Sequence, residues 1–245
     1  MSKSPQVSVV IPAYNEATYI DRLLEALNKQ SFKDFEVIVS DAESKDGTKE
    51  VVNLFNDKLV IKFIEAPPKG PAHGRNIGAK KAKGEWLLFL DADDDIDDPD
   101  FMDILLKKTE LNRWKTSSAK MKFKDKKGLW VLYNYQKLLS HTKRPVASGY
   151  CILTNRELFG RLGGFNEKIK FGEDYEYVSR AAKEGFGFVD ETYFYMDPRR
   201  NENEGWKLIY KGTLNEIHRL FFGYEKLKKN SIKYEFGKHK TRDTD

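Results

Sequence analysis

The segment 86–95, WLLFLDADDD, constrains the fold of this chain more than any other stretch. Its first five residues are apolar, too few for an isolated helix, and they predict a strand buried on both faces in the middle of a parallel sheet. Four acids follow where that strand should end, namely Asp91, Asp93, Asp94 and Asp95. Because like charges this close repel one another, the segment predicts a cation at the end of a buried strand.

A divalent ion is the first candidate for that cation. On an extended chain the carboxylates of Asp91 and Asp93 would point to the same side. Hard oxygen ligands suit Mg²⁺ or Mn²⁺, which usually complete their coordination with substrate phosphates. The alternative is a solvated acidic loop, which is what most charge runs form.

Composition limits the class of protein. With 245 residues, 40% of them hydrophobic, the chain can bury the core of one domain. Much of the net charge of +5 comes from lysines and arginines beyond residue 225, so no nucleic-acid partner is expected. The single Cys151 excludes an internal disulfide, and its apolar neighbours are typical of a buried thiol in a reducing compartment.

No membrane anchor is expected from the sequence. The first five residues lack the apolar core of a signal peptide, and no run approaches the ~20 apolar residues that span a bilayer. We therefore expect a cytoplasmic protein, with a peripheral position at the inner face of the membrane left open.

Strands and helices alternate through the first half of the chain. Apolar runs predict strands at 7–11, 35–39, 60–64 and 86–90, and helical spacing predicts helices at 20–27, 51–55 and 74–83. Pro12 is expected to end the first strand and Asn15 to cap the first helix. This alternation predicts right-handed βαβ units whose loops 12–16, 41–48 and 91–95 meet at one edge as a site.

The second half follows a different pattern. Residues 101–106 predict a helix, 116–123 a strand, 129–139 a helix rich in aromatics, and 148–153 a strand that joins the sheet edge. A glycine pair predicts a turn at 163–164, and a helix is expected to open at Glu173. Segment 206–232 carries one apolar stripe and predicts an amphipathic helical extension, which packs on the domain, rests on an anionic membrane or pairs with a second copy. Residues 233–245 are expected to be disordered.

Six short segments, taken in order, resemble family 2 glycosyltransferases of the GT-A fold. They are 7–16, Asp41 with 46–48, 75–78, 91–94, 163–165 and 173–174. The resemblance runs from residue 7 to about residue 195. It implies an α/β fold with a Rossmann-like, mostly parallel sheet flanked by helices over residues 1–205. In that fold about 5–95 bind a nucleotide-sugar and about 96–205 bind the acceptor.

The resemblance also implies roles for individual residues. Nucleotide binding falls to Pro12, Ala13, Tyr14, Glu16, Asp41, Arg75, Asp91, Arg199 and Arg200. Asp91 and Asp93 match the D-x-D motif, whose second acid holds Mg²⁺ or Mn²⁺ while the first lies against the ribose. Asp174 matches the catalytic base, and Glu173 matches its acceptor-binding neighbour.

The implied reaction moves a sugar from a nucleoside-diphosphate sugar of UDP or GDP type to the hydroxyl of a glycan or lipid-linked acceptor, with inversion. The sequence 41–44, DAES, replaces the family's usual DDGS and leaves the nucleotide open. Transfer to a polyprenyl-phosphate-type lipid at the membrane surface is one alternative. A nucleotidyltransferase or phosphotransferase is another, although 12–16 has neither the glycine nor the basic residue of a phosphate loop. A catalytically silent binding module is a third alternative. The presence of every expected acid argues against it.

Overall fold

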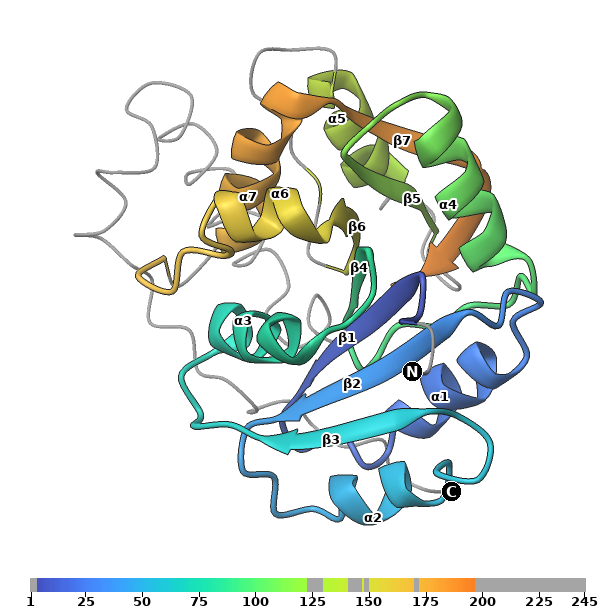
Figure 1. Ribbon diagram of the computed structural model, residues 1–245, viewed down its shortest axis with the longest axis vertical. Coiled ribbons are helices and arrows are strands. Elements are labelled where there is room, and N and C mark those ends of the chain that lie inside the picture. The colour runs from blue at the N-terminus through green and yellow to red at the C-terminus, as the bar shows by residue number, and fades with distance from the viewer. Residues whose placement is uncertain (1–3, 123–129, 141–146, 148–149, 170–171, 197–245) are drawn as a thin grey trace.

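The computed structural model describes residues 4–122, 130–140, 147, 150–169 and 172–196 (Figure 1). The strands are β1 Val7–Ala13, β2 Phe35–Asp41, β3 Ile61–Glu65, β4 Trp86–Leu90, β5 Thr116–Lys122, β6 Cys151–Asn155 and β7 Phe186–Tyr195. The helices are α1 Ile20–Asn28, α2 Thr48–Asn53, α3 Pro71–Lys81, α4 Phe101–Leu111, α5 Trp130–Ser140, α6 Arg156–Arg161 and α7 Glu173–Ala181, which a short 3-10 turn, Ala182–Glu184, extends. The predicted alternation of strands and helices is confirmed.

The strands form one mixed, mostly parallel sheet in the order β3-β2-β1-β4-β6-β5-β7. As predicted, β4 is buried along its whole length, and it pairs in parallel with β1. Its other neighbour is β6, which runs antiparallel. The prediction that this strand joins the sheet edge is wrong, because β6 lies between β4 and β5. Its side chains are buried on both faces of the sheet, as an interior position requires.

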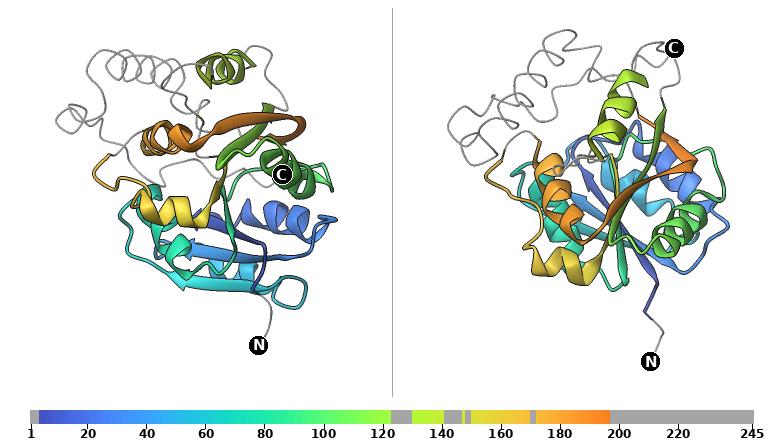
Figure 2. Two further views of the ribbon diagram at one scale, coloured as in Figure 1. Left: turned by 45° about the horizontal axis from the view of Figure 1, so that its top comes forward. Right: turned by 90° about the horizontal axis from the view of Figure 1, so that it is seen from above.

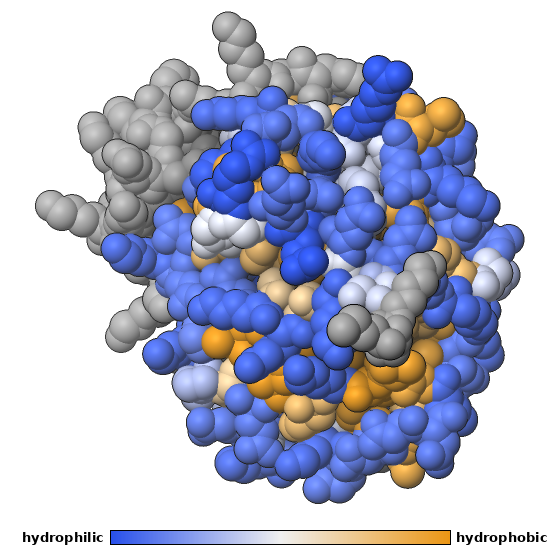
Figure 3. All heavy atoms as spheres, in the orientation of Figure 1, coloured by the Kyte–Doolittle hydropathy of each residue, from blue (hydrophilic) through white to orange (hydrophobic). Residues whose placement is uncertain are grey.

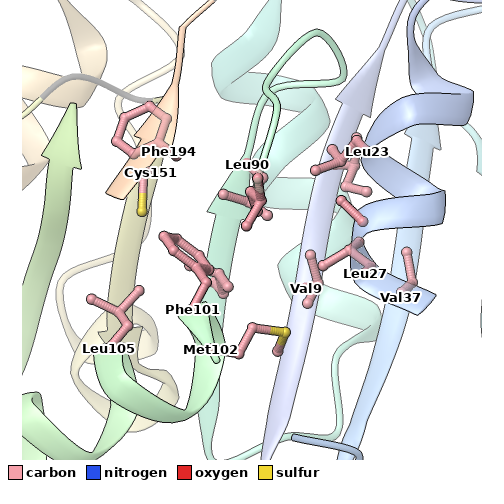
Figure 4. Packing of buried hydrophobic residues seen from close by; sticks show 14 of the residues in the cluster. Val9, Leu23, Leu27, Val37, Leu90, Phe101, Met102, Leu105, Cys151 and Phe194 are labelled. Carbon is pink, nitrogen blue, oxygen red and sulfur yellow. The ribbon is translucent and has the colours of Figure 1, made fainter. Parts of the chain in front are cut away.

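Two apolar clusters cover the two faces of the sheet. The first lies between the sheet and α1, α2 and α4, and Figure 4 shows part of it. The second lies between the sheet and α3, α6 and α7. Alternate residues of β4 supply both, because Leu88 and Leu90 enter the first cluster whereas Leu87 and Phe89 enter the second. Figures 1 and 2 show helices on both sides of the sheet accordingly.

Cys151 is a buried free thiol in the first cluster, as the sequence indicated. Burial raises the pKa of its thiol to about 12.

At the far edge of the sheet, β3 exposes Lys62 and Glu65. Charged side chains of this kind discourage an edge strand from pairing with another chain. Figure 3 shows a largely polar face of the molecule, with apolar side chains exposed in its lower half.

Two predictions at the end of the first strand are wrong. Pro12 does not terminate β1, which continues to Ala13. Pairing with β4 stops at Val10, so β1 has only β2 as a neighbour at Pro12, and a residue without an N–H group is tolerated there. Asn15 does not cap α1, which begins five residues later at Ile20.

Two elements have no counterpart in the sequence-based prediction, α6 and β7. The register of β7 on β5 shifts between Ala119, which pairs with Val189, and Lys120, which pairs with Tyr193. Residues 190–192 therefore form an insertion in the strand, called the β7 bulge below. The predicted extension 206–232 and tail 233–245 lie outside the described residues.

Candidate active site

The carboxyl ends of β1, β2 and β4 meet at one edge of the sheet, because these strands run in parallel. Ala13, the last residue of β1, pairs with Asp41, the last residue of β2. Asp91 directly follows β4. The predicted site residues Pro12, Ala13, Tyr14, Glu16, Asp41 and Asp91 therefore belong to three adjacent strand ends. This is the edge at which open α/β sheets bind ligands.

The loop after β2 is shaped by Asp41, which is almost fully buried. Its carboxylate accepts hydrogen bonds from the hydroxyl of Ser44 at 2.5 Å and from the amide of Ser44 at 2.9 Å. The Ser44 oxygen in turn accepts from the amide of Asn15 at 2.8 Å. Glu43 stands where the family pattern has glycine, and it adopts a left-handed φ of 60°. A non-glycine residue there costs about 1 kcal/mol, which explains why glycine suits the position.

A second set of bonds ties the loop after β1 to the start of α2. The amide of Glu16 donates to the hydroxyl of Thr48 at 2.9 Å, and the amide of Ala17 donates to Asp46 at 3.0 Å. Asp46 also accepts the Thr48 hydroxyl at 2.6 Å. The two loops thus form one unit, and the sequence 46–48 serves to hold it.

Arg75 joins the two halves of the site. Its guanidinium donates to Asp91 at 2.6 Å and to Glu173 at 3.0 Å, and it lies 5.5 Å from the centre of the Phe165 ring. Only 3% of the residue is exposed. Burial opposes its charge, but the carboxylates of Asp91, Glu173 and Asp174 outweigh burial and raise the pKa of Arg75. The arginine therefore stays charged and bridges the end of β4 to the start of α7.

The close approach of α3 to the sheet puts Arg75 in place. A side-chain carbon added at Gly78 would lie 2.4 Å from Val10, and one at Gly74 would lie 3.1 Å from Pro12. Any larger residue at Gly78 would push α3 away from β1, because real contacts of this kind are never so short. The two glycines are thus the local reason that a helix residue reaches the strand ends.

The four acids after β4 have four different environments. They do not continue an extended chain, because the amide of Asp94 bonds the carbonyl of Asp91 at 3.1 Å and closes a turn. Asp91 contacts Arg75, and Asp95 exchanges two backbone bonds with Tyr195. Asp93 is partly exposed. The premise that Asp91 and Asp93 lie on one side of an extended strand is therefore wrong.

Asp94 is fully buried inside this turn. One of its oxygens accepts from the amide of Asp91 at 2.9 Å, whereas the other has no hydrogen-bond partner among the described residues. Burial, followed by the charges of Asp91 and Asp93, holds the pKa of Asp94 well above its usual range. The repulsion expected from four adjacent carboxylates is thus relieved in two ways. Arg75 brings a positive charge to Asp91, and the raised pKa of Asp94 favours its neutral form.

Glu173 and Asp174 open α7, as predicted, directly after Gly172 with its left-handed φ of 83°. Glu173 is buried, whereas Asp174 is partly exposed and accepts from the amide of Tyr175 at 2.8 Å. Burial, then the charge of Asp174, raises the pKa of Glu173 to about 7, although Arg75 acts in the opposite direction. Near neutral pH, Glu173 is therefore close to half protonated.

The loop before α7 is anchored by Asn76, for which the sequence predicted no individual role. Asn76, next to Arg75, bonds the amide of Phe165 at 2.9 Å, the carbonyl of Phe165 at 2.9 Å and Glu167 at 2.8 Å. Glu167 also contacts the Nδ1 atom of His73 at 2.9 Å. Asn76 belongs to the segment 75–78 that carries the family resemblance, so the sequence did mark the position. Its partner Phe165 lies 89 residues away, so the sequence did not indicate the contact.

Some predicted site residues are not placed. Arg199 and Arg200 lie outside the described residues. Within the ranges that the structure describes, no group of three or more His, Cys, Asp or Glu side chains is arranged to hold a metal ion. The roles of Asp93 in metal binding and of Asp41 in base recognition stay predictions.

A mixed, mostly parallel sheet flanked by helices matches the architecture of GT-A structures. Residues 8–163, more than half of the chain, match the family described as glycosyl transferase family 2. The chain therefore belongs to this family, and it carries a family 2 glycosyltransferase domain.

Two curated relatives are similar to this chain over most of its length. The poly(ribitol-phosphate) beta-N-acetylglucosaminyltransferase TarS of Staphylococcus aureus is 30% identical over 233 residues, which cover 87% of this chain and 39% of TarS. An uncharacterized glycosyltransferase of Rickettsia felis is 28% identical over 211 residues, covering 80% of this chain and 35% of the relative. This chain thus spans well under half the length of these relatives.

Solved structures agree on the fold. The structure of S. aureus TarS 1-349 with UDP-GlcNAc has a TM-score of 0.67 at 26% identity, covering 78% of this chain and 58% of that one. The mannosyltransferase PcManGT of Pyrobaculum calidifontis, in complex with GDP-Man and Mn²⁺, has a TM-score of 0.71 at 24% identity, covering 84% and 60%. Among the described residues of this chain, no helix is long and apolar enough to cross a membrane.

Proposed function

We propose that this chain transfers a sugar from a nucleoside-diphosphate sugar to an acceptor hydroxyl, with inversion at the anomeric carbon. One observation carries the proposal. Arg75 holds Asp91, from the predicted nucleotide half, and Glu173, from the predicted acceptor half, on one guanidinium. The acids that the family resemblance assigns to donor and acceptor therefore share one site. The family match favours this reaction over nucleotidyl or phosphoryl transfer.

The donor in this proposal is a UDP or GDP sugar. Its nucleoside would lie against Pro12, Ala13, Tyr14, Glu16 and Asp41, at the ends of β1 and β2. TarS has been seen with UDP-GlcNAc and PcManGT with GDP-Man, so relatives of this fold support both nucleotides. Arg199 and Arg200 would supply positive charge to the diphosphate, and Arg75 would stay with Asp91 rather than reach the nucleotide directly.

The residues at the acidic turn fit Mg²⁺ or Mn²⁺. Asp93 offers a partly exposed carboxylate and matches the second acid of the D-x-D motif, so Asp93 is the principal ligand in this proposal. One or two carboxylates, completed by phosphate oxygens, are a usual environment for Mg²⁺. When bound, the ion would act as a Lewis acid on the negative charge of the leaving diphosphate. PcManGT, a protein of the same fold, has been seen in complex with GDP-Man and Mn²⁺.

Asp174 is the general base in this proposal. The acceptor hydroxyl gives its proton to Asp174 while its oxygen attacks the anomeric carbon, and the bond from that carbon to the diphosphate breaks on the opposite face. Glu173, buried beside it with a raised pKa, would hold the acceptor hydroxyl in position. A general base of this kind contributes about 10²- to 10⁴-fold to the rate.

The donor site is tested by thermal unfolding with UDP, GDP and their common sugar conjugates, each with and without Mn²⁺. We expect one nucleotide class to raise the melting temperature only with metal present, because a ligand that binds the folded state stabilises it. Asp93→Ala should abolish the metal-dependent rise, whereas Asp57→Ala, which removes an exposed acid elsewhere, should not. A metal-dependent rise that survives in Asp93→Ala would refute the metal assignment.

The base is tested by Asp174→Asn. We expect transfer to fall at least 10²-fold while nucleotide binding stays within about twofold of wild type, because the base acts on the acceptor alone. Equal losses of transfer and nucleotide binding would remove Asp174 from this role. Near-normal transfer to a polyprenyl phosphate would instead favour the lipid-phosphate alternative, because such an acceptor is already ionised and needs no base.

A further inference from the structure

Two lysines and two tyrosines form a group on the last two strands of the sheet, called the lysine–tyrosine patch here. It consists of Lys120 and Lys122 of β5 with Tyr193 and Tyr195 of β7. In the register of the two strands Lys120 pairs with Tyr193 and Lys122 with Tyr195, so all four side chains lie on one face. The Nζ atom of Lys122 lies 3.1 Å from the centre of the Tyr193 ring, and the two tyrosine rings pack edge to face at 5.4 Å.

The patch lies on the same face of the sheet as the candidate active site. Thr116 begins β5 and is linked through the hydroxyl of Thr154, at 2.9 Å, to the hydroxyl of Tyr177 in α7, at 2.8 Å. Lys120 and Lys122 follow Thr116 at intervals of two, so they lie on the face that α7 covers. Arg75 and Glu173 come from α3 and α7, the helices of that face.

The patch also lies at the same edge of the sheet. The strand β6 runs antiparallel to both β4 and β5, so β5 and its parallel neighbour β7 end at the edge where β4 ends. Tyr195 exchanges backbone hydrogen bonds of 3.0 and 2.8 Å with Asp95, two residues after Asp93. From β4 to β5 there are two strand spacings, or about 10 Å. One acceptor molecule can therefore touch both the patch and the acids.

The charge of the patch is opposite to that of the neighbouring acids. Within the part of the chain that the structure describes, Lys122 has no carboxylate partner, and its ammonium contacts a tyrosine ring. Lys120 lies close enough to Asp190 to help lower the pKa of that acid, and Asp190 also bonds Tyr133 and Lys137. Lys122 is thus the cation that a ligand would use first.

We propose that the lysine–tyrosine patch is an acceptor subsite for a phosphate-bearing acceptor, which rests on the glycosyl transfer proposed above. A phosphate has several acceptor oxygens, and the ammonium of Lys122 together with the hydroxyl of Tyr193 supplies donors for them. The tyrosine rings offer apolar faces for the carbon skeleton of a sugar or polyol. The phosphate, held at the patch, would leave a hydroxyl of the same molecule to reach Asp174. The phosphate can belong to a soluble polyol phosphate or to a lipid.

The test is ligand-observed NMR binding of matched probes to the full chain at low salt, where charge contacts are least screened. Glycerol 3-phosphate is compared with glycerol, and dodecyl phosphate in neutral micelles is compared with the same micelles alone. We expect at least one phosphate probe to bind tenfold or more tightly than its neutral match. Lys122→Gln should lose this preference and Lys122→Arg should keep it. Whichever phosphate probe binds more tightly identifies a polyol phosphate or a lipid phosphate as the source.

Lys107→Gln is the matched control, because it removes an exposed lysine from α4 on the opposite face. Its phosphate binding should equal that of wild type. Equal binding of phosphate and neutral probes, or phosphate binding that Lys122→Gln leaves unchanged, would overturn the proposal. Binding of these probes needs no nucleotide-sugar donor, so the result is independent of the nucleotide test. A chain that binds nucleotides but shows no phosphate preference would keep the proposed function and lose this subsite.

Discussion

Arg75 brings one positive charge to three carboxylates, those of Asp91, Glu173 and Asp174. Burial, followed by the excess of acids, explains why the pKa of Glu173 is raised although an arginine bonds it. Removing either partner of such a buried pair would leave an uncompensated charge, which typically costs about 3–5 kcal/mol. The site is therefore assembled by a residue that stays inside the protein, and the acids around it can accept positive charge from a ligand.

The raised pKa of Glu173 makes folding stability depend on pH. Between pH 4.5 and about 7 the folded protein keeps a proton on Glu173 that the unfolded chain has already lost. This contribution is therefore present at low pH and is lost as the pH rises through that window. We expect Glu173→Gln to remove this loss, which amounts to roughly 3 kcal/mol for a shift of this size. Urea unfolding at several pH values between 4.5 and 8 measures it.

Glu157→Gln is the control for this measurement, because it changes an exposed glutamate in the first turn of α6. It should keep the wild-type dependence on pH. If Glu173→Gln and wild type lost stability in parallel over this range, the buried carboxyl of Glu173 would not be the group that titrates.

The β7 bulge contacts several other elements. Asp190 bonds Tyr133 and Lys137 of α5, and Glu191 pairs with Lys108 of α4 at 2.6 Å. Thr192 is buried and donates to Asp98, in the loop that follows β4, at 2.7 Å. Three inserted residues thus connect the last strand to two helices and to the loop that begins with the acidic turn. The bulge is a positioning element for that loop.

Thr192→Val tests this role, because valine keeps the shape and removes the hydroxyl. We expect the free energy of unfolding to fall by about 1.5–3 kcal/mol, the usual cost of losing a hydrogen bond to a charged group. We also expect metal-dependent nucleotide binding to weaken, because Asp98 lies five residues after Asp93. Thr192→Ser, which keeps the hydroxyl, should bind nucleotide as the wild type does. If valine lowered stability but left nucleotide binding unchanged, the contact would be structural only.

At the scale of the whole molecule, one sheet runs through both predicted halves. The nucleotide half, about 5–95, supplies β1 to β4, and the acceptor half, about 96–205, supplies β5 to β7. The strand β6 returns to pair along all five residues of β4. The boundary between the halves is therefore a line of hydrogen bonds inside a sheet, with Leu87 and Phe89 packed against residues of the second half.

This continuity predicts that the nucleotide half does not fold alone. A fragment of residues 1–95 would expose the β6-facing edge of β4 together with part of the second apolar cluster, and exposed apolar edges of this kind aggregate. We expect the fragment to be insoluble or to bind the dye ANS strongly, whereas the full chain should unfold in one cooperative urea transition. A soluble fragment with a cooperative transition of its own would show that the halves are independent.

The sequence by itself determined the strands of the first half, the buried character of β4, the acids at the end of that strand and the family. These follow from local signals, because apolar periodicity, glycine pairs and short motifs depend on residues near one another. The helix that opens at Glu173 was predicted for the same reason. Apart from the family, which needed six segments in order, each of these predictions needed only a window of about a dozen residues.

The tertiary structure alone decided the insertion of β6 between β4 and β5, the shift in register at the β7 bulge and the partners of the acids. Arg75 is 16 residues from Asp91 and 98 from Glu173, and no local pattern specifies that the three will meet. Strand order and ion pairing depend on which buried surfaces satisfy one another when the whole chain packs. That is why the sequence predicted a divalent ion among the acids, whereas the fold places the guanidinium of Arg75 beside Asp91.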